Sequence, residues 1–452
     1  MVFKIQAKSF ISIITSKLIL KMSKTFLKGG TNFPGKVALK IDKNILNTIS
    51  KNYKVILITG TNGKTTTTNM IYNIISSTNQ EVITNSSGAN MFSGITACFV
   101  DNYKFTNNNV KYAVIEVDEA NVKYITEYIS PEIICITNLF RDQLDRYGEV
   151  YTTLEKILCG IKKSPKSLLV LNGDESLLGN IDVPNKKIYY GFNCAIDDTI
   201  SVDLNADAKF CKFCKCNYKY NFVTYNHLGD YYCTNCGYKR PELDYHIDKI
   251  VEQSKSGSIV EINNNEISIN QPGTYNIYNA LCAYTVSRVL NIENNVIKHS
   301  LQKQNSSFGR QETINIEDKE LKIILVKNPA GYDQAINAIS LDESKINLAF
   351  MLNDNYADGR DVSWIWDVNF EKLTSLNVDK IMISGIRLYD LAVRLKIAGF
   401  NSDKFHMCKD FEALLSEIIK CDEKTVYLLA TYTAMIDFRK FLYNRKYIKK
   451  LW

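Results

Sequence analysis

Two glycines, a lysine and a run of threonines follow a short apolar stretch in Val55-Ile-Leu-Ile-Thr-Gly-Thr-Asn-Gly-Lys-Thr-Thr-Thr-Thr68. Backbone N–H groups of such a turn can surround phosphate oxygens, and the Lys64 ammonium can neutralise the β- and γ-phosphates. The Thr65 hydroxyl is a suitable Mg²⁺ ligand. We therefore predict a nucleoside triphosphate site, and the alternative is an ordinary turn that happens to contain glycine and lysine. The predicted site residues are Gly60, Thr61, Asn62, Gly63, Lys64, Thr65 and Thr66.

Carboxylates follow a second apolar stretch in Lys111-Tyr-Ala-Val-Ile-Glu-Val-Asp-Glu119. Ligands of parallel α/β sheets bind at the carboxyl ends of the strands. Glu116 lies within the apolar run, so we predict that it holds Mg²⁺ together with Thr65 and assists catalysis with Lys64. Glu119 is expected to lie in a solvated acidic loop.

Five cysteines are concentrated between Cys211 and Cys236, and four of them form two Cys-x₂-Cys pairs separated by eighteen residues. Two such pairs can present four thiolates to a tetrahedral Zn²⁺ at about 2.3 Å per bond, which leaves no open coordination position. We therefore predict a structural zinc site. Cys216 and His227 are alternative ligands. The predicted zinc ligands are Cys211, Cys214, Cys233 and Cys236.

Short apolar strands that alternate with helical stretches must position these side chains, and this alternation predicts an α/β fold. We expect a basic helical segment over residues 1–35 and a central P-loop ATPase domain over 36–313, with the zinc ribbon inserted at about 205–245. Residues 36–50 are expected to be helical. A Rossmann-like C-terminal α/β domain is expected over 314–452, with strands at 323–326, 346–352, 380–384 and 426–430.

The composition is that of an ordinary globular chain of 452 residues, with 45% hydrophobic residues and a net charge of +7. Its twelve cysteines do not form a disulfide framework, which favours the cytoplasm. Lysines interrupt the apolar residues of the first thirty positions too often for a signal peptide or a spanning helix. These residues predict a basic amphipathic helix, which either packs on the protein or rests on the inner face of the membrane.

The glycine loop resembles that of Mur ligases and folylpolyglutamate synthases, which are ATP-dependent amide-forming enzymes. Two further runs support the resemblance: Gln271-Pro-Gly-Thr-Tyr-Asn-Ile-Tyr-Asn279 and Gly309-Arg-Gln-Glu312. The resemblance implies that Asn279 meets the adenine and that Arg310 approaches the phosphate or ribose. The chain has Gln143 where many Mur ligases have histidine, and neither Lys156 nor Lys162 can be matched to their carbamylated lysine.

Two features make the resemblance more specific and are similar to the synthetase subunits of lipid II isoglutaminyl synthases. These features are the cysteine ribbon and the run Asn353-Asp-Asn-Tyr-Ala-Asp-Gly-Arg-Asp361-Val-Ser-Trp-Ile-Trp-Asp367. This resemblance implies ATP-dependent amidation of the D-glutamate α-carboxylate of lipid II through an acyl phosphate. It also implies a GatD-like glutamine amidotransferase partner, in a heterodimer or larger complex, which releases ammonia. Asp361, or in second place Asp358, is expected to complete the partner's catalytic triad. The alternative is an aspartate turn that caps a helix.

Two other functions remain possible from the sequence. A Mur-type or folylpolyglutamate-type ligase would add an amino acid instead of ammonia. A zinc ribbon with basic charge is also compatible with nucleic-acid binding, although no basic stripe interleaved with aromatic residues supports it. Glutamine hydrolysis by this chain itself is disfavoured, because it has four histidines and no cysteine in a recognisable nucleophile setting.

Overall fold

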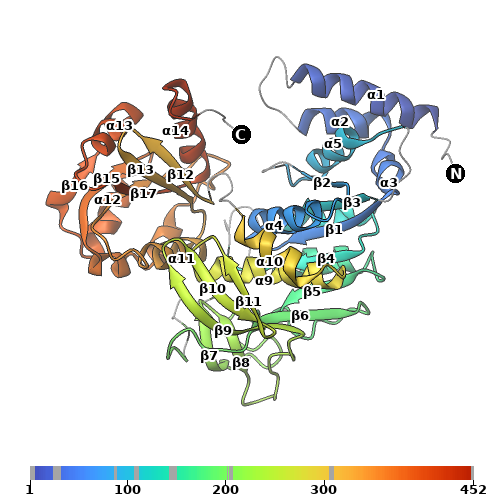
Figure 1. Ribbon diagram of the computed structural model, residues 1–452, viewed down its shortest axis with the longest axis horizontal. Helices are drawn as coiled ribbons and strands as arrows, with labels where there is room; N and C mark the ends of the chain where they lie inside the picture. Colours follow the sequence, from blue (N-terminus) through green and yellow to red (C-terminus); the bar gives the residue numbers. More distant parts are fainter. Residues whose placement is uncertain are drawn as a thin grey trace.

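A computed structural model of the protein describes residues 6–23, 32–85, 89–105, 111–141, 150–200, 202, 207–304 and 310–448. Two β-sheets with helices on both faces make up most of the structure (Figure 1). A small two-stranded sheet accompanies the larger one. These three units correspond to the predicted α/β fold with an insertion.

The larger sheet has nine strands in the order β11-β10-β9-β6-β5-β4-β1-β3-β2. Strands β1 to β6 and β9 run parallel, while β10 and β11 form antiparallel pairs at one edge. The central strands are buried on both faces because their residues are almost all valine, isoleucine or leucine. The strands are β1 (Tyr53–Thr59), β2 (Val82–Thr84), β3 (Lys111–Glu116), β4 (Ile133–Ile136), β5 (Leu168–Asn172), β6 (Lys187–Phe192), β9 (Tyr245–Ser254), β10 (Gly257–Ile262) and β11 (Asn265–Ile269).

Alternate residues of β1 divide the hydrophobic core of this sheet into two halves. Val55 and Leu57 face one layer of helices, whereas Ile56 and Ile58 face the other. The first layer contains α1 (Ala7–Met22), α2 (Asn32–Ile41), α3 (Ile45–Ser50), α5 (Phe92–Asn102), α6 (Val122–Ile125) and α8 (Val150–Ile161). The second contains α4 (Lys64–Ser76), α9 (Thr274–Val289) and α10 (Asn294–Gln302).

The second sheet has six strands in the order β12-β13-β17-β14-β15-β16, and every pair except β12–β13 is parallel. Helices α11 and α12 cover one face, and α13 and α14 cover the other. The strands are β12 (Arg310–Ile316), β13 (Lys319–Leu325), β14 (Ile346–Met351), β15 (Val378–Ser384), β16 (Phe405–Met407) and β17 (Thr425–Ala430). The helices are α11 (Pro329–Ile339), α12 (Leu388–Ile397), α13 (Phe411–Ile419) and α14 (Tyr432–Asn444).

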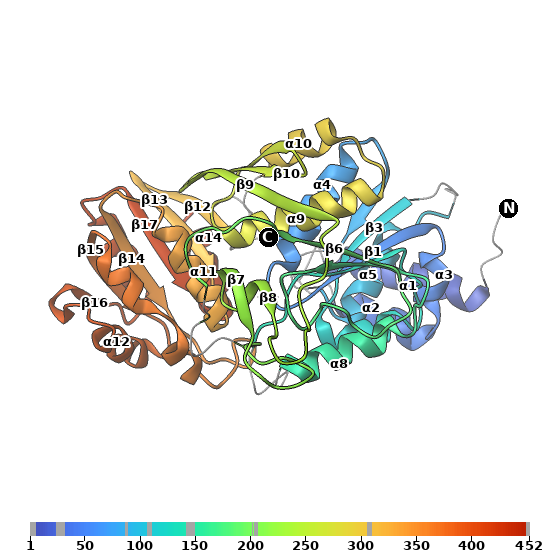
Figure 2. The ribbon, with the colours of Figure 1, turned by 90° about the horizontal axis from the view of Figure 1, so that it is seen from below.

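The two-stranded sheet of β7 (Lys219–Tyr225) and β8 (Leu228–Tyr232) lies between β6 and β9 in the chain. Its own small core consists mainly of tyrosines and cysteines, including Tyr218, Tyr220 and Tyr231. Figure 2 shows this sheet below the larger one, beside the second α/β unit.

The predicted α/β fold and the four predicted C-terminal strands are confirmed. Residues 36–50 form parts of two helices, because the chain turns at residues 42–44 between α2 and α3. The predicted domain boundary at residue 313 falls within β12, which already pairs with β13 of the second sheet. Within the described residues, the structure contains no helix long and apolar enough to span a membrane.

Candidate active site between the two sheets

The glycine loop connects the carboxyl end of β1 to the first turn of α4. Gly60 and Gly63 have φ angles of 123° and 82°, which residues with a side chain rarely adopt. A Cβ atom on Gly63 would lie 2.1 Å from Asn279 Oδ1, so this position also lacks space for a side chain. The loop therefore keeps its backbone close to α9 and directs the start of α4 toward the site.

Residues after β4 hold the glycine loop from the other side. The Asn62 N–H donates to Asn138 Oδ1 at 2.9 Å, and the Asn138 amide returns a bond to the Asn62 carbonyl at 3.1 Å. The Thr137 hydroxyl also donates to the Asn62 carbonyl at 2.7 Å. Thr61 exchanges hydrogen bonds with the backbone of Phe140. The loop is thus fixed before any ligand binds.

The Lys64 ammonium is buried at the amino end of α4. It donates to the Thr61 carbonyl at 3.2 Å and to Glu119 Oε1 at 3.0 Å, and it also contacts the Gly60 carbonyl. Burial lowers the pKa of Lys64, but Glu119, Glu116 and Asp118 outweigh this effect and raise it above the usual value. The lysine therefore stays cationic at the position where phosphate charge would gather. Glu119 is buried, so the prediction of a solvated loop at this residue was wrong.

Thr65 and Glu116 lie side by side at the same end of the sheet. The Thr65 hydroxyl donates to Glu116 Oε2 at 2.8 Å, and Asn90 Nδ2 donates to Glu116 Oε1 at 2.9 Å. Asn85 fixes the backbone of Glu116 through both its N–H and its carbonyl. A hydroxyl and a carboxylate held together in this way are the oxygen ligands that Mg²⁺ prefers.

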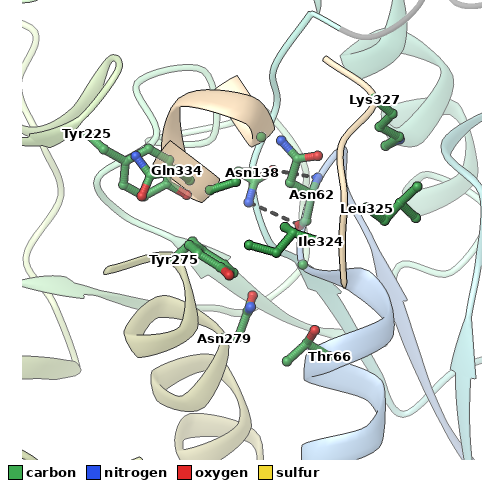
Figure 3. A pocket seen from close by; sticks show the side chains of 13 residues that line it. Asn62, Thr66, Asn138, Tyr225, Tyr275, Asn279, Ile324, Leu325, Lys327 and Gln334 are labelled. Atoms are coloured by element: carbon green, nitrogen blue, oxygen red, sulfur yellow. Dashed lines mark hydrogen bonds between the residues drawn. The ribbon is translucent and has the colours of Figure 1, made fainter. Parts of the chain in front are cut away.

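A cavity opens between the glycine loop and the second α/β unit (Figure 3). The Asn279 side chain lines this cavity. Its Oδ1 accepts a hydrogen bond from the Thr67 hydroxyl, and its Nδ2 donates to Asn276 Oδ1 at 3.2 Å. The cavity has a mixed lining, which suits a ligand with both a flat apolar part and an anionic part. Side chains around it that the sequence did not single out include Tyr225, Tyr275, Ile324, Leu325 and Gln334.

Lys327 and Asn328 bring the second unit to the glycine loop. The side-chain amides of Asn62 and Asn328 exchange hydrogen bonds, at 3.4 Å in one direction and 3.2 Å in the other. Asn328 also caps α11 by accepting the Gly331 N–H. Lys327 lines the cavity, and its positive charge joins that of Lys64 in opposing the rise in the Glu119 pKa that burial causes. A second cation thus stands near the phosphate-binding loop.

A buried acidic pair connects this site to the two-stranded sheet. Glu175 Oε2 accepts the Leu139 N–H at 3.1 Å and lies 2.8 Å from His227 Nε2. Burial lowers the pKa of His227, but Glu175 outweighs this effect and raises it. Asp174 binds Arg240 and the Tyr278 hydroxyl in the same region. His227 is therefore part of this network and is not a ligand at the cysteine cluster.

The four predicted cysteines come together, and all of their Sγ atoms lie within 4.8 Å of one another. The Sγ atoms of Cys211 and Cys236 are 3.5 Å apart, and those of Cys214 and Cys233 are 3.4 Å apart. These spacings fit a tetrahedral Zn–S₄ shell, in which sulfurs are about 3.8 Å apart. Hydrogen bonds from Asn235 and the Cys216 N–H lower the pKa of Cys214 to about 6, whereas at Cys236 the backbone bond from Tyr238 is outweighed by burial and the neighbouring thiols, which raise the pKa to about 12.

The two candidate aspartates of the second unit have different surroundings. Asp358 is buried, where it accepts the Thr433 N–H at 2.7 Å and also contacts the Thr433 hydroxyl. Asp361 is exposed and accepts the Ser363 N–H at 2.8 Å, and a further hydrogen bond from the Ser363 side chain helps to lower its pKa. Neither lines the cavity beside the glycine loop. A partner protein could therefore reach Asp361 but not Asp358 without a rearrangement.

The structure brings the predicted loop residues, Glu116 and Asn279 into one site and leaves Asp361 outside it. Arg310 begins β12, but its side chain lies outside the described residues, as does Gln143. Glu119, Lys327 and Asn328 are additional site residues. The Asn-Pro pair at 328–329 was a sequence signal for Asn328, because a helix often begins with a capping asparagine followed by proline.

Known proteins share the fold and parts of the sequence of this chain. A family model for the Mur ligase middle domain matches residues 58–237, and one for the MurT ligase C-terminal domain matches residues 325–435. The solved pseudomurein peptide ligase type C from Methanothermus fervidus superposes with a TM-score of 0.68 at 21% identity, over 89% of this chain and 81% of that one. The fold is that of the Mur ligases, which are ATP-dependent ligases.

Two curated relatives narrow this class. The MurT subunit of the glutamine-hydrolysing lipid II isoglutaminyl synthase from Streptococcus pneumoniae is 42% identical over 93% of this chain and 94% of its own length. Its counterpart from Staphylococcus aureus is 35% identical over 86% of this chain and 88% of its own. The chain belongs to the MurT family.

Proposed function

We propose that this chain amidates the D-glutamate α-carboxylate of the lipid II stem peptide, using ATP and ammonia from a GatD-like partner. The main support is the cluster of Lys64, Thr65 and Glu116 at the glycine loop, faced by Lys327 from the second unit. Membership of the MurT family supports the choice of substrate, because the curated relatives are subunits of lipid II isoglutaminyl synthases.

A carboxylate must be activated before ammonia can attack it. In the proposed reaction a carboxylate oxygen attacks the γ-phosphorus of ATP, the bond to the β-phosphate oxygen breaks, and an acyl phosphate and ADP form. Ammonia then attacks the carbonyl carbon, phosphate leaves with the bonding electron pair, and the nitrogen loses a proton. Phosphoryl transfer requires mainly positioning and charge neutralisation, which the loop N–H groups, Lys64 and Lys327 supply.

Thr65 and Glu116 are the residues that would hold Mg²⁺, because their oxygens are already 2.8 Å apart at the amino end of α4. The ion would neutralise negative charge on the transferred phosphoryl group. Asn90 orients Glu116 from behind. Asn279 is the proposed adenine contact, and Arg310 the proposed phosphate or ribose contact.

The proposed zinc ion has a structural role. The four cysteine ligands would complete its coordination, so no open position remains for a substrate. The ribbon then closes a small tyrosine-rich core that could not be stable by its size alone. Metal analysis of the purified chain and of Cys233→Ser tests this, and the absence of zinc from the unaltered chain would refute it.

The ammonia source is the proposed partner, which would dock on the second unit. Four exposed apolar residues form a stripe that begins just before α12 and continues along it, and Arg394 of that helix donates to the carbonyls of Ile365 and Val368, four and seven residues after Asp361. The stripe and Asp361 are both exposed parts of the second unit, and Asp361 is the residue we propose to complete the partner's triad. The stripe residues are Ile386, Tyr389, Val393 and Ile397.

The test is amidation of lipid II by the chain co-purified with a candidate GatD-like partner, with the product identified by mass. Amidation lowers the substrate mass by about one unit, whereas ligation of an amino acid would add a whole residue. A product of the second kind would favour the amino-acid ligase and refute the proposal. The unmodified substrate, with ATP consumed or not, would refute it as well.

Asp361→Asn provides a second reading of the same assay. We expect glutamine-dependent amidation to fall at least about tenfold, because the partner's histidine loses its orienting carboxylate. Amidation with added ammonium chloride should remain normal. Asp403→Asn, at another exposed aspartate of this unit, should change neither activity. Full glutamine-dependent activity of Asp361→Asn would exclude this residue from the triad.

A further inference from the structure

Helix α1 directs its large apolar side chains away from the protein. Phe10 is 49% exposed, Ile11 56%, Ile14 38%, Leu18 59% and Met22 61%. Ile11, Ile14, Leu18 and Met22 are three or four residues apart, so they form one stripe along the helix. We call these five residues the outer face of α1. The helix lies at the outer edge of the molecule, above α2 and α5 (Figure 1).

The buried face of α1 is made largely of serines. Ser9 donates to Asp42 at 2.6 Å, and Ser12 donates to the Ala38 carbonyl at 2.9 Å. Ile13 and Leu20 are the apolar residues that α1 buries. A surface helix of a globular protein normally shows the opposite arrangement, with its apolar side chains toward the core. The apolar side chains of the outer face are therefore not part of the hydrophobic core.

Several contacts fix α1 in this orientation. The Lys17 ammonium donates to the Tyr103 carbonyl at 2.6 Å and to the Asp101 carbonyl at 3.3 Å, just beyond and at the end of α5. The rings of Phe10 and Phe105 are 5.3 Å apart. Rotation of the helix to bury its outer face would break these bonds and those of the serines.

The positive charge of the sequence is concentrated in the segment that contains this helix. Residues 1–52 contain ten lysines and one aspartate, a formal charge of +9. The whole chain carries +7, so the remaining 400 residues carry −2. The single aspartate, Asp42, is buried and bound to Ser9. The outer face of α1 thus belongs to a strongly basic segment of an otherwise slightly acidic protein.

We propose that the outer face of α1 docks on an anionic phospholipid membrane. An apolar stripe bordered by lysines is the arrangement with which interfacial helices enter the boundary between headgroups and acyl chains. Lysines near an anionic surface add electrostatic attraction to it. A second copy of the chain is a poorer occupant, because pairing two outer faces would bring two segments of like charge together.

This surface lies one helix length from the candidate active site. Helix α5 has 11 residues and is therefore about 16 Å long. The end of α5 near Tyr103 binds α1, and the segment before its other end carries Asn90, which binds Glu116. Docking through α1 would hold the site close to the bilayer, where a lipid-linked substrate is found. This consequence rests on the proposed function, but the docking itself does not.

The test uses the full chain and vesicles that contain no lipid II, so that it is independent of the amidation reaction. Sedimentation with vesicles of phosphatidylglycerol and phosphatidylcholine should retain the protein, and pure phosphatidylcholine or high salt should release it. Ile14→Glu with Leu18→Glu should weaken retention at least tenfold. Val251→Glu, which places a carboxylate at a half-exposed apolar position on β9, should not.

Three results would overturn the proposal. The first is that the anionic vesicles retain the double variant as well as the unaltered chain, and the second is that they do not retain the unaltered chain. The third is that the unaltered chain forms a concentration-dependent dimer and the double variant does not. Circular dichroism and amidation of a short-chain, water-soluble lipid II analogue would show that the double variant is folded and active. A failure of that amidation in the unaltered complex would instead count against the proposed function.

Discussion

Lys64 combines a phosphate-binding role with a structural one, because its charge is buried against Glu119. Removing one member of a buried ion pair leaves the other charge uncompensated, which typically costs about 3–5 kcal/mol. Lys64→Met should therefore lose amidation activity and also lower the free energy of unfolding. The combined Lys64→Met and Glu119→Gln variant should be inactive as well, but it should recover much of that stability. Urea unfolding of the two variants measures the difference.

Equal stability of the single and double variants would contradict the pairing of Lys64 with Glu119.

Glu119 shows why the sequence could not predict this ion pair. A glutamate three positions after the end of a strand has the same local pattern whether it faces solvent or a lysine 55 residues earlier in the chain. The contact depends on how β1 and β3 are placed side by side, which local patterns do not contain.

The strand-loop-helix element around Gly63 was predictable because its signals are local. Gly63→Ala should be destabilised by about 1–2 kcal/mol from the left-handed backbone alone. The added Cβ would also meet Asn279 Oδ1 at 2.1 Å, so the KM for ATP should rise. Gly399→Ala has a similar φ of 102° but its Cβ would find no atom closer than 3.9 Å.

Thermal unfolding and ATP-dependent kinetics of these two variants separate backbone strain from steric conflict. We expect Gly399→Ala to lose some stability and keep its KM. If Gly63→Ala behaved in the same way, the contact between the loop and α9 would be unimportant for nucleotide binding. The comparison therefore tests the element and not only the residue.

Other elements were less visible in the sequence. Strands β9, β10 and β11 extend the larger sheet after the ribbon, and the three-residue β16 completes the smaller one. Their segments are short or rich in polar residues, so their pattern is weak. The helix at residues 7–22 was predicted as amphipathic, but three of the five residues that it buries are serines, and most of its large apolar side chains face outward. The periodicity of apolar residues does not show that a buried serine can donate a hydrogen bond to a backbone carbonyl of a neighbouring helix, as Ser12 does.

At the scale of the whole molecule, an ion pair joins the two α/β units far from the glycine loop. Lys255, between β9 and β10, donates to Asp342 Oδ1 at 2.9 Å, and the Tyr427 hydroxyl donates to Oδ2 at 2.8 Å. Burial raises the pKa of Asp342, but its bonds with Ser344, Lys255 and Tyr427 outweigh this effect and lower it to about 2. The resulting stability is present above the ordinary pKa of an aspartate, about 3.9, and is lost as the pH falls toward 2.

Asp342→Asn should therefore be less stable than the unaltered chain at neutral pH, and the difference should shrink between about pH 4 and pH 2. Denaturant unfolding across this range measures it. Asp403→Asn, an exposed aspartate without such partners among the described contacts, should follow the unaltered chain at each pH. A difference that stayed constant down to pH 2 would mean that the carboxylate charge does not hold the two units together.

Hydrogen bonds connect His227 through Glu175 to Leu139, and this connection would make the ATP-binding loop depend on the cell's zinc supply. Leu139 and Phe140 directly follow the asparagine that holds the glycine loop, and the Phe140 N–H binds Thr61. If the ribbon binds zinc as proposed, loss of zinc would loosen the turn that carries His227. The support beneath the ATP-binding loop would then weaken in a cell that is short of the metal. Supply of a trace element would then limit how much cell-wall precursor this chain can modify.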